Sequence, residues 1–446
     1  MVTPLLSELA SFDKSFSTLS LHADAHLADS SDIAPAIGVS TTFRFPDPDV
    51  THRHGEGLNG EKHHIYSRES TNNRDRLEIV LGTLNEGHSV TYASGLAAGF
   101  AAVIHLRPNR VAIRGGYHGT HGFLKEIIDI DSPLLSGDLV WLESPHNPDG
   151  LIFGKRLMSR SWVPRAYLCL TPPTFANRDP HPDIAHYVER SHAVGAKVLV
   201  DATFAPPPLQ YPFRLGVDVI MHSTTKYFSG HSDGLGGLLV VRSKEEADEV
   251  VMAVYSFLLH YRESYGNRSV HVHWRHRIFS HDEPQLRLDR TYTGSVLGSL
   301  ETWLLLRSAS DHKEHDGIPA HSIHSVLHSS LQHYPQGWDV EKQHPGGHGA
   351  TFSVLVTRLL PMSFCLMQPA TSLGAIESLI EWRYPVDPTI DQRLVRVSVG
   401  LEDLEDLKED WRRALKKVIQ EAGTETGGYF WEKAGTGGEV EYLPPL

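Results

Sequence analysis

The segment from residue 217 to residue 241 constrains the fold most, because it places a polar loop between two apolar, β-branched runs. Residues 217–221 and 238–241 both have the composition of buried strands. The loop between them is rich in Ser, Thr, Gly and His and holds one lysine, Lys226. This lysine is either a solvated loop charge or an amine whose pKa is lowered by burial and neighbouring positive charge. In the second case it is a nucleophile that can hold an aldehyde as a Schiff base.

Composition excludes several classes of protein. The formal net charge of −13 argues against nucleic acid or an anionic membrane as the main partner. Two cysteines without a CxxC pair indicate neither a disulfide framework nor a thiolate zinc site, and they fit a reducing compartment. The first 22 residues lack a basic segment followed by an apolar one, and no apolar run reaches about 18 residues. We therefore expect a cytoplasmic protein without a membrane span.

Histidine is frequent, with 29 residues, and this count raises the question of a metal site. His22 and His26 have the spacing of one helix face, and His271, His273 and His276 are close in sequence. Neither group has flanking carboxylates or a matching ligand set, so we interpret these histidines as polar surface positions and expect no metal.

Two short patterns in the first half of the chain are typical of anion-binding sites. Tyr66 and Arg68 precede a predicted helix at 75–84. They either form an ordinary turn or bind a phosphate through the phenol and the guanidinium group. A predicted strand at 90–93 is followed by Ser94, Gly95 and Leu96 at the start of a small-residue helix. The backbone N–H groups of such a start bind anions, although close packing explains the same residues.

Three further side chains follow predicted strands. Tyr117 lies in a glycine-rich turn, where it can stack on a flat ligand that approaches the backbone. Asn147 stands between two prolines after the strand 139–142, which is either a structural turn or a ligand position at a strand end. Asp201 ends the strand 197–200 and is either a turn cap or the partner of a buried cation.

The predicted organisation is an N-terminal arm at 1–60, a large domain at 61–295, a smaller C-terminal α/β domain at 296–422 and a flexible tail at 423–446. In the C-terminal part the pattern predicts helices at 297–307 and 403–420 and a strand at 396–399.

The motif HSTTKYFSGHSDGLGG around Lys226 closely resembles the lysine motif of the pyridoxal 5'-phosphate (PLP) enzymes of Cys/Met metabolism, the family of cystathionine γ-synthase, γ-lyase and β-lyase. YSRESTNNRDRLE, YASGLAA, GGYHGT, ESPHNP, VDATFAPP and RVSVGLEDLEDL resemble the other blocks of this family, in the same order. The resemblance implies an aspartate aminotransferase-like fold of type I, with a large, mainly parallel seven-stranded sheet and a smaller α/β domain.

The resemblance also implies roles for individual residues. Lys226 would hold PLP and move protons between substrate carbons, while Asp201 would keep the pyridine nitrogen protonated. Tyr117 would stack on the ring and act as an acid or base, and Arg396 would bind the substrate α-carboxylate with help from Ser372. The remaining cofactor contacts would be made by Ser94, Gly95, Leu96, Asn147, Thr203, Ser223 and Thr225, and by Tyr66 and Arg68 from a neighbouring subunit of a homodimer or homotetramer.

The implied activity is the making or cleavage of C–S bonds at Cβ or Cγ of homoserine-derived amino acids or cystathionine. The chain departs from the family pattern at Thr371, where γ-enzymes often carry Glu, and in the segments 154–179, 259–284 and 357–368. These segments are either inserted loops or errors of exon joining. Two alternatives therefore stay open, namely γ-substitution with a carbon or nitrogen nucleophile in secondary metabolism, and a catalytically impaired binding or regulatory subunit.

Overall fold

The computed structural model describes residues 15–27, 33–44, 64–152, 183–253, 316–319, 322–323, 325–332, 339–356, 360–388 and 390–426. The chain divides into two compact units. Unit 1 is Met1–Arg114, Gly119–Leu142 and Val188–Arg290, and unit 2 is Gly115–His118, Glu143–Tyr187 and Thr291–Leu446. The helix predicted at 297–307, the whole of segments 154–179 and 259–284 and residues 357–359 of the third segment lie outside the described residues. The predicted boundaries near residues 60 and 295 lie outside them as well.

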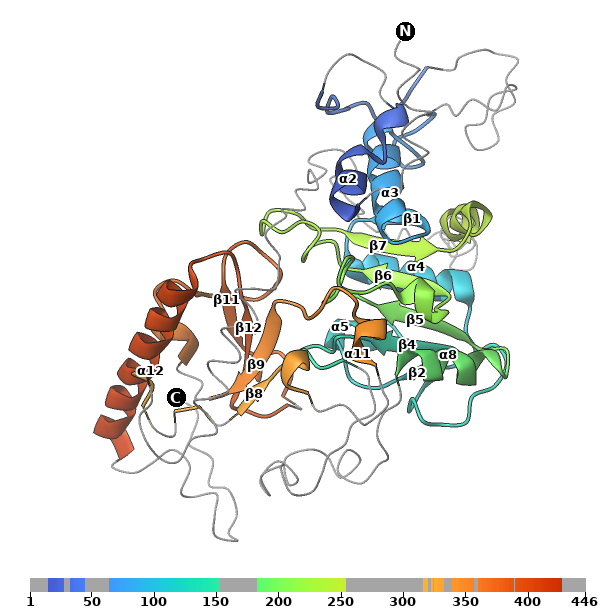
Figure 1. Cartoon of the computed structure of the whole chain (residues 1–446). Coiled ribbons are helices and arrows are strands. Elements are labelled where there is room, and N and C mark those ends of the chain that lie inside the picture. The colour runs from blue at the N-terminus through green and yellow to red at the C-terminus, as the bar shows by residue number, and fades with distance from the viewer. Residues whose placement is uncertain are drawn as a thin grey trace, which may run out of the picture. The chain divides into compact units, whose positions relative to one another are not determined.

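Unit 1 is built on a seven-stranded sheet in the order β1-β7-β6-β5-β4-β2-β3, which Figure 1 shows from β1 at the top to β2 near the bottom. Strand β5 is parallel to β6, and β2 is parallel to β3 and β4, whereas β7 is antiparallel to both β1 and β6. The predicted mainly parallel seven-stranded sheet is thereby confirmed. The strands are His88–Tyr92 (β1), Val111–Ile113 (β2), Ile127–Ile128 (β3), Leu139–Glu143 (β4), Lys197–Asp201 (β5), Val219–His222 (β6) and Gly237–Val241 (β7).

The central strands are apolar because both faces of the sheet are covered. Every residue of β4, β6 and β7 is buried, as expected for strands of a largely parallel sheet. The apolar face of helix α4 packs on β6 and β7. The helical segments of the first half of the chain are Phe16–His22 (α2), Ala25–Leu27 (η1), Asn72–Leu84 (α3), Gly95–Leu106 (α4), His118–His121 (α5), Ile184–His192 (α8) and Pro212–Leu215 (η2), followed by helical residues 244–253.

The register of this sheet brings four strand ends to one edge. Tyr92 at the end of β1 pairs with Gly237 at the start of β7, and Asp201 at the end of β5 pairs with Met221 of β6. The loops that follow β1, β5 and β6 therefore begin side by side. In open α/β sheets this carboxyl edge is where ligands bind.

Unit 2 contains a five-stranded sheet in the order β10-β11-β12-β9-β8, in which only β10 and β11 are parallel neighbours. Its strands are Ser325–Leu327 (β8), Thr351–Leu355 (β9), Gln368–Pro369 (β10), Leu379–Trp382 (β11) and Leu394–Ser398 (β12). Where the structure describes this unit, its helical segments include Ser329–Leu331 (η3), Val340–Gln343 (α11), Leu360–Ser363 (η4) and Leu404–Thr426 (α12).

Helix α12, the long red helix of Figure 1, confirms the amphipathic helix predicted at 403–420. Leu407, Trp411, Leu415 and Val418 recur at helical spacing and are at most 1 % exposed. The helix continues to Thr426, past the predicted domain boundary at residue 423, and the predicted tail stays a prediction. The single Gly423 costs a helix only about 1 kcal/mol, so it does not end α12.

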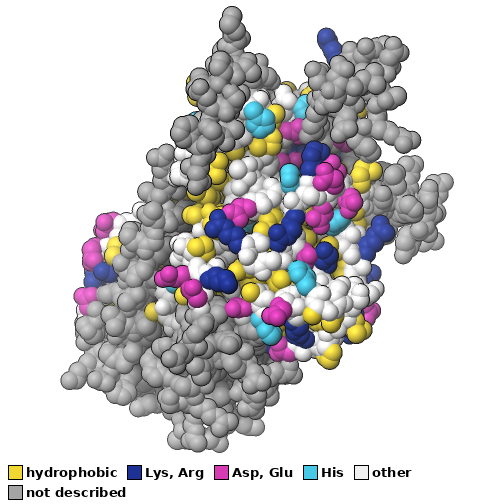
Figure 2. Space-filling view, turned by 45° about the vertical axis from the view of Figure 1, so that its right-hand side comes forward, with side chains coloured by type: hydrophobic (Ala, Val, Ile, Leu, Met, Phe, Trp, Pro, Cys, Tyr) yellow, Lys and Arg dark blue, Asp and Glu magenta, His cyan; other side chains and the backbone are white. Residues whose placement is uncertain are grey.

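On the face of the molecule that Figure 2 draws, acidic and basic side chains are interspersed, and neither sign of charge dominates. Within the described ranges, each helix is too short or too polar to traverse a bilayer.

Candidate active site

The Lys226 loop connects β6 to β7 at the carboxyl edge of the large sheet. The backbone of Lys226 is held in a tight turn, because its N–H donates to the Ser223 carbonyl at 3.3 Å and its carbonyl accepts the Gly230 N–H at 2.8 Å. The lysine side chain is half-buried. The predicted loop between two buried strands is therefore confirmed, and the chemical role of its lysine stays a prediction.

A hydrogen-bond network joins the end of β5 to this loop. Thr203 donates its N–H and its hydroxyl to Oδ1 of Asp201, at 3.0 and 2.5 Å. The same hydroxyl accepts the backbone N–H of Ser223 at 2.8 Å. Asp201 and Ser223 follow from parallel neighbouring strands, so the register of the sheet brings them within reach of one threonine. Thr203 thus fixes the carboxylate relative to the first residue of the loop.

The Asp201 carboxyl is buried, and its environment favours a neighbouring cation. The side chain is 5 % exposed. Burial raises the pKa of this carboxyl to about 6, although the hydrogen bonds from Thr203 lower it. A desolvated carboxylate is stabilised by an opposite charge within hydrogen-bonding distance. The protonated ring nitrogen of PLP is such a partner, and the residues present fit it.

The start of α4 provides backbone donors at the same edge. Ser94 is the N-cap, and its side chain accepts the Ala97 N–H at 3.1 Å. The N–H groups of Gly95 and Leu96 lie in the first turn, where a helix has no intrahelical acceptor for them. A Cβ on Gly95 would lie 2.8 Å from Cβ of Ser223, so only glycine allows this helix start to pack on the Lys226 loop. The structure is therefore compatible with both interpretations of Gly95, namely close packing and an anion site.

Thr225 makes hydrogen bonds to the residue before β7. Its hydroxyl donates to the Gly236 carbonyl at 3.3 Å and accepts the Gly236 N–H at 3.2 Å. These two hydrogen bonds hold Thr225 of the Lys226 loop next to the start of β7. The predicted contact of Thr225 with a phosphate is untested, and the structure shows a positioning contact for the same atom.

Tyr66 and Arg68 lie in the segment before α3. Tyr66 forms an isolated bridge with Thr42, and the Arg68 guanidinium lies over the tyrosine ring, 5.0 Å from its centroid. Arg68 is exposed. The pair is thus presented together on the surface of unit 1, which is compatible with the predicted contact to a neighbouring subunit.

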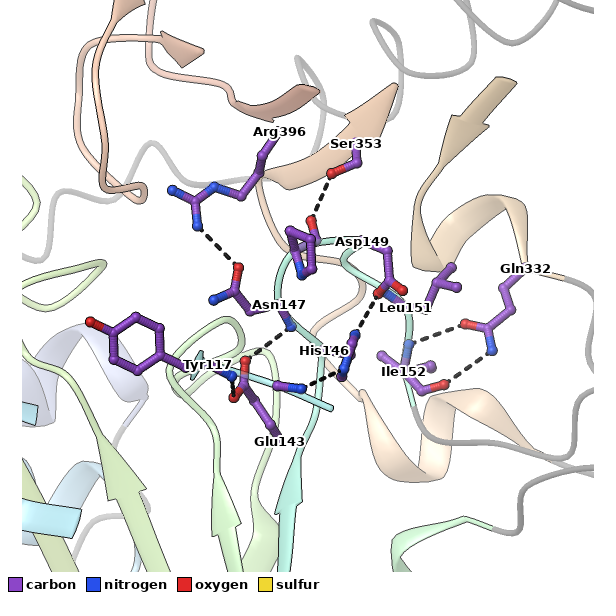
Figure 3. Close-up of polar contacts among 12 residues, drawn as sticks. Tyr117, Glu143, His146, Asn147, Asp149, Leu151, Ile152, Gln332, Ser353 and Arg396 are labelled. Carbon is purple, nitrogen blue, oxygen red and sulfur yellow. Dashed lines mark hydrogen bonds and ion pairs between the residues drawn. The ribbon is translucent and has the colours of Figure 1, made fainter. Parts of the chain in front are cut away.

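In unit 2, one carboxylate organises two of the predicted ligand-binding residues. Glu143, at the end of β4, accepts the Tyr117 N–H on Oε2 at 2.7 Å and the Asn147 N–H on Oε1 at 3.0 Å (Figure 3). The side chain is 8 % exposed. Tyr117 and Asn147 are far apart in sequence, and Glu143 fixes the backbone of both.

The two glycines before Tyr117 allow its turn to lie close to the side chains of Glu143 and His146. Gly115 and Gly116 have positive φ angles of 61° and 86°. A Cβ on Gly116 would lie 2.5 Å from Oε2 of Glu143, and one on Gly115 would lie 2.4 Å from Nε2 of His146. His146 in turn accepts the Gly116 N–H on Nε2 at 2.7 Å. The glycine-rich turn therefore serves both the backbone conformation and the close contact.

Arg396, in the centre of the second sheet, is 5 % exposed and is held from three sides. It donates from Nη1 to Oδ1 of Asn147 at 3.0 Å (Figure 3) and from Nη2 to the Ser372 carbonyl at 2.8 Å. Its third partner is Glu381, at 2.5 Å from Nη2. Ser372 has a φ of 86°, a conformation that costs free energy for a residue with a side chain and that clusters at ligand sites. The structure thus brings Asn147, Ser372 and Arg396 together, and the predicted roles of Asn147 toward the cofactor and of Ser372 and Arg396 toward the substrate stay predictions.

Two of these side chains, Glu143 and Glu381, were not singled out from the sequence. Glu143 opens the ESPHNP block and was available as a carboxylate at a strand end. Glu381 was available as the charged residue of the apolar strand β11, and Arg383, which follows this strand, lies with Nη1 3.1 Å from both of its carboxylate oxygens. In each case the contact that gives the residue its importance comes from a segment distant in sequence.

We expect Glu143→Gln to destabilise unit 2. An amide has one acceptor oxygen, so the N–H of either Tyr117 or Asn147 would face the amide NH₂ group. A buried donor left without an acceptor costs about 1–3 kcal/mol. Chemical denaturation should show a loss of this size in the free energy of unfolding, with the exposed Glu377→Gln as a control. Equal stability of Glu143→Gln and wild type would contradict the view that Glu143 stabilises unit 2 by accepting both N–H groups.

Comparison with known proteins identifies the family and the fold of the chain. The family model described as "Cys/Met metabolism PLP-dependent enzyme" matches residues 17–130 and 174–310, more than half of the chain. Cystathionine gamma-synthase of Mycobacterium bovis is 29 % identical over 400 residues, which cover 78 % of this chain and 86 % of the relative. Cystathionine gamma-lyase of Saccharomyces cerevisiae is 26 % identical over 452 residues, covering 90 % and 98 %. O-succinylhomoserine sulfhydrylase of Pseudomonas aeruginosa is 33 % identical over 239 residues, covering 52 % and 56 %.

Solved structures show the same fold. The crystal structure of metB from Corynebacterium glutamicum superimposes with a TM-score of 0.69 at 24 % identity, covering 91 % of this chain and 99 % of that one. The crystal structure of a cystathionine gamma-lyase (CalE6) from Micromonospora echinospora gives a TM-score of 0.64 at 25 % identity, covering 90 % and 99 %. The fold is that of the type I PLP-dependent enzymes, and the chain belongs to the Cys/Met metabolism PLP-dependent enzyme family.

Proposed function

We propose that this PLP-dependent protein is a cystathionine γ-synthase-like enzyme. It would make or cleave C–S bonds at Cβ or Cγ of homoserine-derived amino acids or of cystathionine. The observation that carries the proposal is the buried Asp201 carboxyl, which is joined through Thr203 to the Lys226 loop and whose pKa is raised to about 6 by burial. Family membership and the names of the relatives support the reaction class.

The proposal gives each cluster of side chains a task. Bound PLP withdraws electrons from the substrate Cα, which makes its proton removable. Lys226 would hold the cofactor and carry protons between substrate carbons, and Asp201 would keep the ring nitrogen protonated. Arg396 would bind the α-carboxylate of the substrate. The cofactor contacts that the resemblance assigns to Tyr117 and Asn147 would depend on the backbone positions that Glu143 fixes.

The choice of a synthase among the family's activities rests on similarity alone. Synthase and lyase relatives match at comparable identities. Thr371, where the γ-enzymes often carry Glu, is exposed next to Ser372. A change of residue beside the carboxylate-binding segment would favour a different leaving group or nucleophile, which keeps γ-substitution by a carbon or nitrogen nucleophile as the second candidate.

Product analysis tests the proposal directly. Purified, PLP-loaded protein is incubated with O-acetylhomoserine or O-succinylhomoserine and cysteine, with cystathionine alone, and with non-thiol nucleophiles. Cystathionine formation would support the synthase assignment, and release of an α-keto acid from cystathionine alone would indicate a lyase. Products that form only with carbon or amine nucleophiles would favour the second candidate. PLP binding without turnover of any of these compounds would contradict both and leave a binding or regulatory subunit.

We also propose a homodimer or homotetramer located in the cytoplasm. The exposed Arg68, stacked over Tyr66, supports a contribution of one subunit to the phosphate of its neighbour. A monomer in light-scattering measurements on the PLP-loaded protein would contradict the shared site.

A further inference from the structure

The turn that carries Tyr117 is held by side chains of the ESPHNP block at two successive N–H groups. Nε2 of His146 accepts the Gly116 N–H, and Oε2 of Glu143 accepts the Tyr117 N–H, each at 2.7 Å (Figure 3). The first N–H belongs to the peptide group before Cα of Gly116, and the second belongs to the peptide group after it. The two hydrogen bonds therefore act on the φ and ψ angles of this glycine from both sides.

The backbone of Gly116 is the flexible point in front of Tyr117. Its φ is 86°, in a region that residues with a side chain rarely adopt. Glycine has a wide range of φ and ψ, so each of the two flanking peptide groups needs its own restraint. Glu143 restrains the second group, and His146 restrains the first. A rotation at Gly116 would change the direction of the Tyr117 side chain, which is 38 % exposed.

The hydrogen bonds of His146 select one tautomer of its ring. A backbone N–H can only donate, so Nε2 carries no proton and the ring proton lies on Nδ1. Nδ1 is 3.1 Å from Oδ1 of Asp149, which also accepts the Leu151 N–H at 3.1 Å. Asp149 thereby holds the ring in the form that can accept from Gly116.

The groups around His146 act in opposite directions on its protonation. Partial burial lowers the pKa of His146, and the carboxylates of Asp149 and Glu143 outweigh burial and raise the pKa to about 9. The Gly116 N–H opposes this rise, because it can bond only to the neutral ring. The hydrogen bond to Gly116 is therefore formed most completely on the alkaline side of this pKa.

We propose that His146 is a positioning residue for the contact between Tyr117 and PLP. Through Gly116 it sets the backbone conformation from which the tyrosine ring is directed, and Asp149 keeps the acceptor nitrogen available. The inference rests on the proposed function in one respect, the stacking of Tyr117 on the cofactor ring. His146 itself need not touch PLP or the substrate.

The test replaces the histidine by two amides of different length. His146→Asn keeps a donor for Asp149 but has no atom at the position of Nε2, whereas His146→Gln can place its amide oxygen there. PLP is titrated into cofactor-free protein at about pH 9.5, above the pKa of His146, and its dissociation constant and visible circular dichroism are measured. We expect His146→Asn to weaken PLP binding about 3- to 10-fold, the range for one aromatic contact, and to lower the dichroism. His146→Gln keeps the acceptor and should stay within about 2-fold of wild type.

A double-mutant cycle tests whether the effect of His146 passes through Tyr117. In a Tyr117→Ala background, His146→Asn should change the dissociation constant of PLP by less than about 2-fold, because the contact that it positions is already lost. His192→Asn is the control, since His192 pairs with Asp218 at 2.9 Å in unit 1, and it should leave both readings unchanged. If His146→Asn does not fold, His146→Leu takes its place in the cycle.

The outcomes separate this inference from the proposed function. Equal weakening of PLP binding with and without Tyr117 would overturn the inference, and so would a wild-type affinity of His146→Asn. A loss that His146→Gln does not restore would overturn the role of the Nε2 acceptor. A wild-type affinity of Tyr117→Ala would remove the premise and overturn the inference as well. The expected cycle supports the inference even if no C–S bond is made or broken, a result that would overturn the proposed function alone.

Discussion

Lys226→Ala is expected to abolish the visible absorption of the PLP-loaded protein and to lower turnover at least about 10³-fold. The reason is that the variant loses both the covalent attachment of the cofactor and the amine that carries protons, and proton transfer alone contributes about 10²–10⁴-fold. The measurement combines an absorption spectrum of the dialysed protein with a rate of product formation. The tight backbone turn around Lys226 does not involve its side chain, so we expect the fold to be retained.

Two controls separate covalent binding from charge. Lys226→Arg keeps the positive charge but cannot bind the aldehyde, so it should behave like Lys226→Ala. Lys244→Ala removes an exposed lysine that pairs with Asp248 and should behave like wild type. Retention of the absorption band and of turnover in Lys226→Ala would show that another amine holds the cofactor, and the site assignment would be wrong.

Asp201→Asn is expected to give the second largest loss, about 10²–10³-fold in kcat, the range for removing one preorganised electrostatic partner. Asparagine keeps the shape of the side chain and an acceptor for the Thr203 N–H, so the network to Ser223 can persist. It cannot hold the ring nitrogen in its protonated form. The rate should fall while the absorption band of bound PLP remains, although shifted. A variant with wild-type kcat would contradict the role of Asp201.

The same residue predicts a pH dependence for the cofactor-free protein. The Asp201 pKa rises from 3.8 to about 6 on folding, because the carboxylate is buried. A raised pKa means that the folded state binds the proton more tightly, so this contribution to stability is complete below pH 3.8 and is lost as the pH rises to about 6. The loss amounts to about 3 kcal/mol. Unfolding free energies measured between pH 4 and pH 7 should show this decline for wild type and not for Asp201→Asn.

A surface carboxylate provides the comparison. Asp248→Asn alters an exposed residue and should keep the pH profile of wild type. Added PLP should remove most of the decline in wild type, since a pyridinium partner stabilises the charged carboxylate. A decline that is the same in Asp201→Asn would mean that other groups cause it.

Local sequence patterns were sufficient for the elements that carry the Lys226 loop. The β-branched runs predicted the strands on both sides, and the Ser-Gly pattern predicted where α4 begins. These features depend on burial, strand propensity and capping, which act within a few residues of each other. The end of α12 was predicted less well, because helix ends are decided by small free-energy differences.

The order of the elements, the family and the residue types of the candidate site could all be predicted from the sequence. The contacts by which some side chains hold others in place depend on the tertiary structure. Thr203 links Asp201 to the backbone of Ser223 by hydrogen bonds. Glu143 accepts the backbone N–H groups of Tyr117 and Asn147. Glu381 forms ion pairs with both Arg383 and Arg396. The physical reason is that these bonds depend on strand register and burial, which bring together groups that are distant in sequence and that no local pattern connects.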